Sequence, residues 1–264
     1  MPMNIDDFLD YSLQEDFKNL NNTHRSMVNA VRRVKTAADQ GNLDALQQAL
    51  ARYEELVDKQ KESLQGFKDK FPSFDLQSYL LEEFHAGFLG ALAEEGLSVE
   101  AEYPVYEVLP FKVRVLPEKE MITIDDRVYR NLRPGVVARH LKKEIDKLNA
   151  ASFDVQRFLQ TLANAYDTEM ARQVAKTKIF LCEQEVLLKD VYDNLTPMPQ
   201  QKRDYPVQLF AFSLHRVLKS GQMNAPDGRR LWLGNVRNRR QALVVLDAQK
   251  QPQRYGVIKF YREG

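Results

Sequence analysis

The chain has 264 residues, of which 44% are hydrophobic and 28% are charged. This composition is typical of a globular protein and excludes disorder along the whole chain. Eleven glycines and eleven prolines exclude collagen-like and low-complexity sequence. The single cysteine, Cys182, excludes an intrachain disulfide and a cysteine-based zinc site.

The sequence predicts neither a signal peptide nor a membrane span. The first residues, 1–7, are acidic where a signal peptide would be basic, and no apolar segment follows them. No stretch approaches the length of a transmembrane helix. Because the chain also has a single cysteine, we expect a cytoplasmic location.

The net charge of +1 hides an asymmetry between two parts of the chain. Residues 200–264 contain 13 Lys or Arg and 4 Asp or Glu, whereas the remaining 199 residues contain 25 basic and 33 acidic residues. A basic part of this kind is typical of anion binding, with nucleic acid as the first candidate. The alternative is that the basic part packs on the acidic part of the same chain.

The first 70 residues carry two runs of apolar residues at helical spacing. From Phe17 to Ala38 the spacing alternates between three and four, with His24 filling a gap, and the pattern returns from Leu43 to Phe67. The intervening residues 40–42 favour a turn, because a glycine there suits a left-handed position and the asparagine after it can cap a helix. We therefore expect a long antiparallel helical hairpin.

A third helix and a β-rich segment are predicted next. Ser73 or Asp75 can cap the helix, which runs to about Glu95. The following residues are rich in Val, Tyr and Phe, and those at 111–115 alternate between apolar and basic, as a half-buried strand does. With strands also expected at 121–125 and 127–130, this segment is predicted to be a β-hairpin insertion.

The next segment has no glycine or proline from Val136 to Thr196. Ser152 and Asp154 resemble a helix start, so we expect one helix before them and a longer one after them. The longer helix is expected to run to about Leu195. A central helix of this length would be a coiled-coil arm, a kinked pair or a spine on which both ends pack.

The C-terminal residues read as a small helix-plus-strand module. A polar linker over 199–204 precedes a helix that begins near Leu209 and ends near Gly221. Strands are expected at 230–234, 242–247 and 254–261, forming a three-stranded antiparallel meander. The predicted fold is therefore α+β, with domains at 1–95 (hairpin and third helix), 96–133 (β-hairpin insertion), 134–198 (long helical segment) and 199–264 (basic module).

Motifs for catalysis and cofactor binding are missing from the sequence. It contains no glycine-rich phosphate loop and no nucleophile-elbow motif. Cys182 is expected mid-helix as a small core residue. Glu82 and His85 have the spacing of a carboxylate-bridged metal site, but the second Glu-x-x-His that such a site requires is missing. We therefore predict no catalytic residue, no metal site and no cofactor.

The basic residues of the C-terminal module and of the middle β-segment are the candidate site. Arginine forks match phosphate oxygens, and Trp232 and Tyr255 are candidates to stack on bases, although a core position is favoured for Trp232 and Phe260. The predicted nucleic-acid-binding residues are Arg229, Arg230, Arg237, Arg239, Arg240, Arg254, Lys259, Lys112 and Arg114.

Three functions follow from these patterns. The leading hypothesis is a non-enzymatic accessory subunit that binds a protein partner through its helical arms and nucleic acid, DNA or RNA, through its basic module. The second is a structural coiled-coil adaptor or homodimer with no nucleic-acid binding. The third is a divergent metal-dependent nuclease that uses Glu107, Asp125 and Asp126.

Overall fold

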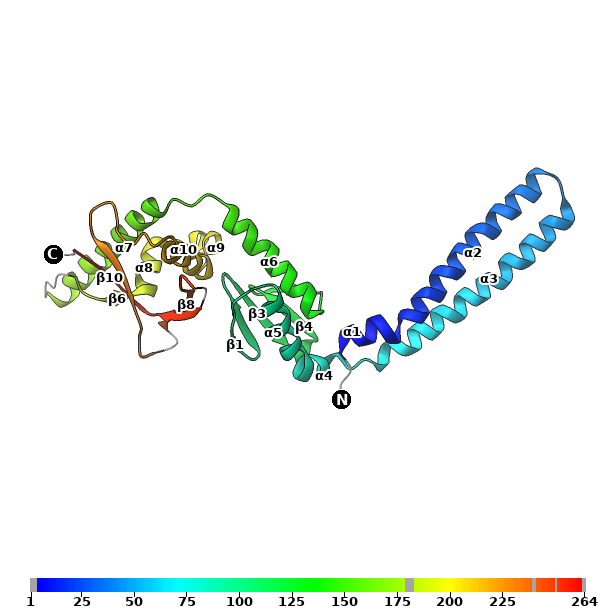
Figure 1. Ribbon diagram of the computed structural model, residues 1–264, viewed down its shortest axis with the longest axis horizontal. Helices are drawn as coiled ribbons and strands as arrows, with labels where there is room; N and C mark the ends of the chain where they lie inside the picture. The colour runs from blue at the N-terminus through cyan, green and yellow to red at the C-terminus, as the bar shows by residue number, and fades with distance from the viewer. Residues whose placement is uncertain (1–3, 179–182, 239–240, 250, 263–264) are drawn as a thin grey trace. The chain divides into compact units, whose positions relative to one another are not determined.

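A computed structural model describes residues 4–178, 183–238, 241–249 and 251–262 (Figure 1). The predicted α+β class is confirmed, because long helices and antiparallel sheets alternate along the chain. The chain divides into two compact units, residues 1–84 and 85–264. No helix among the described residues has both the length and the apolar character needed to cross a membrane.

The first unit consists of helices. Two long antiparallel helices lie side by side in it (Figure 1). Gly41 has a φ of 66° and the side chain of Asn42 accepts a hydrogen bond from the Ala45 amide, so the predicted turn is confirmed. The helical segments are α1 (Ile5–Asp7), η1 (Phe8–Ser12), α2 (Gln14–Asp39), α3 (Leu43–Lys70), η2 (Phe71–Ser73), α4 (Leu76–Ser78) and η3 (Tyr79–Glu83).

About half of the residues predicted to lie in the seam between α2 and α3 do lie there. For the other half, the residue one position earlier in the sequence lies in the seam instead. Leu20, Met27 and Val34 face the seam as expected. The residues that complete the seam of α2 include the buried Ala30 and Ala37, whereas the apolar or aromatic residues that follow each such position are exposed. Small side chains that hydropathy does not single out therefore form the interface, and larger ones are left outside.

The third helix forms as predicted but in pieces. Asp75 caps it through the Ser78 amide, α4 and the π-helical η3 lead into α5 (Phe84–Glu94), and the left-handed Gly96 follows its end. The β-rich segment after it is larger than the expected hairpin. It is a five-stranded antiparallel sheet in sequence order, made of β1 (Glu100–Glu102), β2 (Val105–Val108), β3 (Phe111–Leu116), β4 (Met121–Ile124) and β5 (Arg127–Tyr129), with η4 (Pro117–Lys119) between β3 and β4.

Two helices pack on this sheet. The ring of Phe88 in α5 contacts Tyr106 at a centroid distance of 5.1 Å, and His140 in α6 (Pro134–Ala150) stacks on Tyr129 at 4.9 Å. Apolar side chains of alternate strand positions, such as Val113 and Val115, are fully buried beneath them. The alternation that predicted a half-buried strand therefore identified the covered face correctly.

The long helix after Asp154 is shorter than expected. Asp154 caps α7 (Val155–Thr177) as predicted, but the chain turns left-handed at Lys178, and α8 is a separate helix over Leu188–Leu195. Between them, β6 (Val186–Leu187) pairs with a C-terminal strand, so tertiary pairing overrides local helical propensity. The prediction for Cys182 lies outside the described residues.

The C-terminal module differs from the expected meander in its strand pairing. Residues expected as a linker form a short helix, α9 (Pro199–Asp204), before α10 (Val207–Ser220). The last strand is interrupted at Gly256: its first part, β9 (Pro252–Tyr255), pairs with β8 (Leu243–Leu246), and its second part, β10 (Val257–Tyr261), lies between β6 and β7 (Arg230–Gly234). A core that includes Phe210, Val245 and Phe260 joins these strands to α7, α8 and α10.

Candidate nucleic-acid interface

The outer face of the β7 and β10 strands carries alternating aromatic and basic side chains. The inward residues Leu231, Ile258 and Phe260 are at most 2% exposed, so the residues between them point away from the core. Trp232 is paired with Lys259 across the strands, and Arg230 is paired with Tyr261. Aromatic rings and cations beside one another are the elements with which sheets bind single-stranded nucleic acid.

Trp232 lies across Gly234. A Cβ atom at residue 234 would come within 2.1 Å of the Cη2 atom of the indole, so glycine is required for the ring to lie this close to the strand. The side of the indole away from the strand contributes to an exposed fraction of 38%. The expectation of a core tryptophan is therefore wrong, whereas the expectation of a core Phe260 is confirmed.

Lys259 lies between two aromatic rings. Its Nζ atom is 5.7 Å from the ring centroid of Trp232 and 5.2 Å from that of Tyr261. Contacts at this distance are favourable cation–π interactions, and they hold the ammonium at the surface of the sheet. The arrangement places one positive charge between two rings that can stack on bases.

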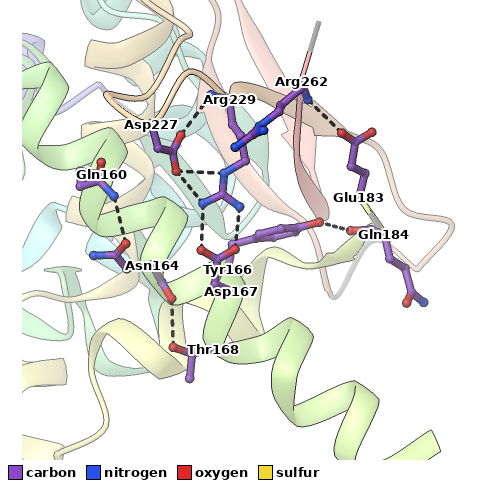
Figure 2. Close-up of polar contacts among 10 residues, drawn as sticks. All are labelled: Gln160, Asn164, Tyr166, Asp167, Thr168, Glu183, Gln184, Asp227, Arg229 and Arg262. Carbon is purple, nitrogen blue, oxygen red and sulfur yellow. Dashed lines mark hydrogen bonds and ion pairs between the residues drawn. The ribbon is translucent and has the colours of Figure 1, made fainter. Parts of the chain in front are cut away.

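Arg229 is held in an ion-pair cluster instead of facing solvent (Figure 2). Its guanidinium donates two hydrogen bonds to the Asp167 carboxylate, at 2.6 and 2.8 Å, and two to Asp227, at 2.7 and 2.9 Å. The hydrogen bonds from Arg229 lower the pKa of Asp227, and the carboxylate of Asp167 is the main cause of a raised pKa at Arg229. This residue joins the start of β7 to α7, so its charge is neutralised within the chain.

Residues near this cluster tie the end of the chain to α7 and the segment after it. Figure 2 shows the Tyr166 hydroxyl donating to the Gln184 carbonyl oxygen at 2.7 Å and the backbone amide of Arg262 donating to the Glu183 carboxylate at 2.9 Å. Burial raises the pKa of Tyr166 to about 12, so the phenol stays protonated and can donate. These contacts fix β10 and hence the aromatic face.

The other predicted cations lie in two places. Arg254 forms an ion pair with Glu100, and Lys112 lies 4.0 Å from Glu107, around a cavity of about 540 Å³. Arg114 is 3.9 Å from Asp126 on the same sheet. Like Arg229, these side chains therefore have acidic neighbours, which lowers their value as phosphate ligands.

The arginine-rich loop after β7 is only partly described. Arg237 is exposed there, and Arg239 and Arg240 lie outside the described residues. Tyr255 packs against the core of the module, so it does not join the aromatic face. Tyr261 does join it, and the sequence signal for this was available: a residue next to the buried Phe260 in a strand must point outward.

Of the three residues predicted for a nuclease site, Glu107 and Asp125 both lie next to Lys112, whereas Asp126 lies near Arg114. Glu107 pairs with Lys112 across β2 and β3, and the Asp125 carboxylate accepts a hydrogen bond from the Lys112 amide at 2.9 Å. Burial is the main cause that raises the pKa of Glu107, and Lys112 opposes it. In the part of the chain that the structure describes, no group of three or more His, Cys, Asp or Glu side chains is placed to hold a metal ion.

Comparisons with protein-family models, with curated proteins and with solved structures gave no match to this chain. Its function must therefore be inferred from its own geometry.

Proposed function

We propose that this chain is a non-enzymatic accessory subunit, acting in the cytoplasm, that binds a protein partner through its helical hairpin and nucleic acid through its C-terminal module. The observation that carries the nucleic-acid part is the outer face of β7 and β10, where Trp232 and Tyr261 alternate with Lys259 and Arg230. The cytoplasmic part of the proposal rests on the single cysteine.

This face suits single-stranded nucleic acid better than a duplex. The exposed Trp232 and the half-buried Tyr261 can each take one unstacked base, and such stacking contributes about 1–3 kcal/mol per base. The ammonium of Lys259 beside the rings is placed to contact a phosphate that follows the bases, and such a contact releases counterions. Binding should therefore be strong at low salt and should weaken steeply as salt is added.

The test is fluorescence anisotropy with labelled single- and double-stranded DNA and RNA across a salt series. We expect Lys259→Ala and Trp232→Ala to weaken binding to single strands about tenfold each, because each removes one phosphate or base contact. Lys219→Ala is the matched control, because Lys219 is an exposed lysine at the end of α10 and not on the aromatic face. Equal affinity in all variants, or no binding at low salt, would reject this part of the proposal.

A second candidate is a structural adaptor without nucleic-acid binding. It is favoured by one specific observation: Arg229 and Arg254, both in the basic C-terminal region, are paired with acidic residues of the preceding segment, Asp167 and Glu100. In this case the charge asymmetry serves internal docking. A stable complex or dimer that shows no affinity for nucleic acid at low salt would select this function.

A further inference from the structure

The long hairpin leaves a row of side chains exposed on each of its helices. On α2 the row repeats every seven residues as Phe17, His24, Val31 and Ala38, and on α3 as Leu43, Leu50, Val57 and Leu64. All are exposed except Val57, which is half-buried, and the exposed fraction reaches 74% at Leu43. We name these eight residues the apolar face.

Both rows lie on the same side of the hairpin. Each row occupies the position just after a seam residue, such as Ala30 on α2 and Ala49 on α3, so the two rows are equivalent in the heptad pattern. Antiparallel helices are related by a two-fold axis perpendicular to their common plane, and equivalent positions therefore face the same side of that plane. The apolar face is thus one continuous surface.

The register of the helices interleaves the two rows. Phe17 contacts Phe67 at a centroid distance of 5.0 Å, and Lys70 pairs with Asp16 at 2.6 Å, so residues of α2 and α3 at the same height have numbers that add to about 84–86. Leu64 then lies between Phe17 and His24 along the axis, and Leu50 lies between Val31 and Ala38. From Phe17 to Ala38 the surface extends about 32 Å.

The opposite side of the hairpin is different in character. Near the turn it contains an open cavity of about 550 Å³ with a floor of alanines and with arginines at its rim, including Arg33 and Arg52. The large apolar side chains are therefore not spread around the hairpin. Their restriction to one side is typical of a docking surface.

The surface fits one helix better than a second hairpin. A single helix seated between α2 and α3 contacts the seam residues and the apolar face, whereas a second hairpin lying flat on the first would also cover the next position outward on each helix. Seven of the eight residues at that outer position are polar or charged. The eight residues are Gln14, Asn21, Val28 and Lys35 on α2, and Gln47, Glu54, Lys61 and Lys68 on α3, of which only Val28 is apolar.

The charged residues at these outer positions indicate which kind of helix the apolar face would bind. Lys61 is paired with Asp58 at 3.0 Å, which leaves Lys35 and Lys68 as basic residues against the single acidic residue Glu54, so a helix with acidic flanks is complementary. We propose that the apolar face binds one amphipathic helix of a partner protein, about 20 residues long, with an apolar seam flanked by Asp and Glu. This rests on the proposed function and specifies the chemistry of the protein partner.

The test uses two synthetic helical peptides of about 22 residues with the same leucine seam, one flanked by glutamate and one by lysine. Labelled peptide is titrated with the full-length chain, and binding is followed by fluorescence anisotropy. We expect saturable binding of the glutamate peptide and at least tenfold weaker binding of the lysine peptide. Leu50→Glu should weaken binding of the glutamate peptide at least tenfold, because Leu50 lies in the middle of the face.

Ala51→Glu is the matched control. Residue 51 is the exposed neighbour of Leu50 but points away from the apolar face, so binding should be unchanged. Circular dichroism verifies that both variants keep their helices. Equal binding of both peptides, or equal effects of the two variants, would overturn the proposal.

Sedimentation of the chain alone tests whether a second copy of the chain covers the apolar face. A dimer that dissociates on Leu50→Glu, with no peptide binding, would show that a second copy covers the face and would overturn the single-helix proposal. A monomer that binds neither peptide would also overturn it. Loss of nucleic-acid binding in the anisotropy series leaves these results unaffected, so the two proposals fail separately.

Discussion

The helical hairpin and the C-terminal module use their apolar side chains in opposite ways. α2 and α3 have 26 and 28 residues, yet their buried residues are Ala30, Ala37, Ala49 and Leu56. The module instead packs large side chains such as Phe210 and Phe260 into one core. The large apolar side chains of the module are thus used within a core that it shares with α7 and α8, whereas those of the hairpin remain exposed on one side.

Removal of one large apolar side chain from each region should have very different effects on stability. Phe210→Ala should lower the free energy of unfolding by about 3–5 kcal/mol, because it leaves a cavity in the core. Leu50→Ala should change it by less than about 0.5 kcal/mol, since this side chain is 50% exposed. Urea denaturation followed by the fluorescence of the single tryptophan, Trp232, reports on the module, and circular dichroism reports on the helices.

A loss of several kcal/mol with Leu50→Ala would show that the apolar face is already covered in the free protein. The hairpin would then bury its large apolar side chains, as the module does.

The ion-pair cluster at Arg229 should stabilise the module. Arg229→Met should lower the free energy of unfolding by about 1–2 kcal/mol at neutral pH, because it leaves the partly exposed Asp167 and Asp227 without their shared partner. Because the pKa of Asp227 is lowered in the folded state, its stabilising effect is present above the unfolded pKa of about 4 and is lost as the pH falls through the folded pKa.

The difference between wild type and Arg229→Met should therefore shrink below about pH 4. The matched control is Arg203→Met on α9, an exposed arginine, which should change stability little at any pH. A difference that stays constant down to acid pH would assign the effect to lost packing on Phe260 instead of charge.

Much of this fold follows from local chemistry in the sequence. The caps at Asn42, Asp75 and Asp154 and the left-handed Gly41 were predictable, because each requirement is satisfied within a few residues. The seam of the hairpin was half predictable, since hydropathy favours Val31 over Ala30, although backbone spacing selects the alanine. Which residues of a helix lie in the seam depends on how closely the partner helix packs against it, and the hydropathy of the helix alone does not predict this.

The long-range pairings were not predictable in the same way. The strand at 186–187 forms because β10 lies beside it, and the break at Gly256 divides one expected strand between two sheets. At the candidate site, alternation around Leu231 and Phe260 could have placed Trp232 and Tyr261 outward. The charge asymmetry allowed for packing of the basic part on acidic residues, but the acidic partners of Arg229 and Arg254, Asp167 and Glu100, lie in distant segments, so the individual pairs could not be predicted.

The seam of the hairpin contains a polar side chain, Gln60, whose replacement is expected to stabilise it. The Oε1 atom of Gln60 is buried and finds no hydrogen-bond partner among the residues that the structure describes, which costs free energy in the folded state. Gln60→Leu should therefore stabilise the hairpin by about 1 kcal/mol, because it removes the unsatisfied group and adds apolar contact. Hydrogen exchange should slow about fivefold in peptides from α3 and should not change in peptides from the module.

Gln65→Leu is the matched control, since Gln65 is an exposed residue of the same helix that donates a hydrogen bond to Asp69 at 2.7 Å. Equal slowing in both variants would show that helix propensity, and not the buried amide, limits the stability of the hairpin.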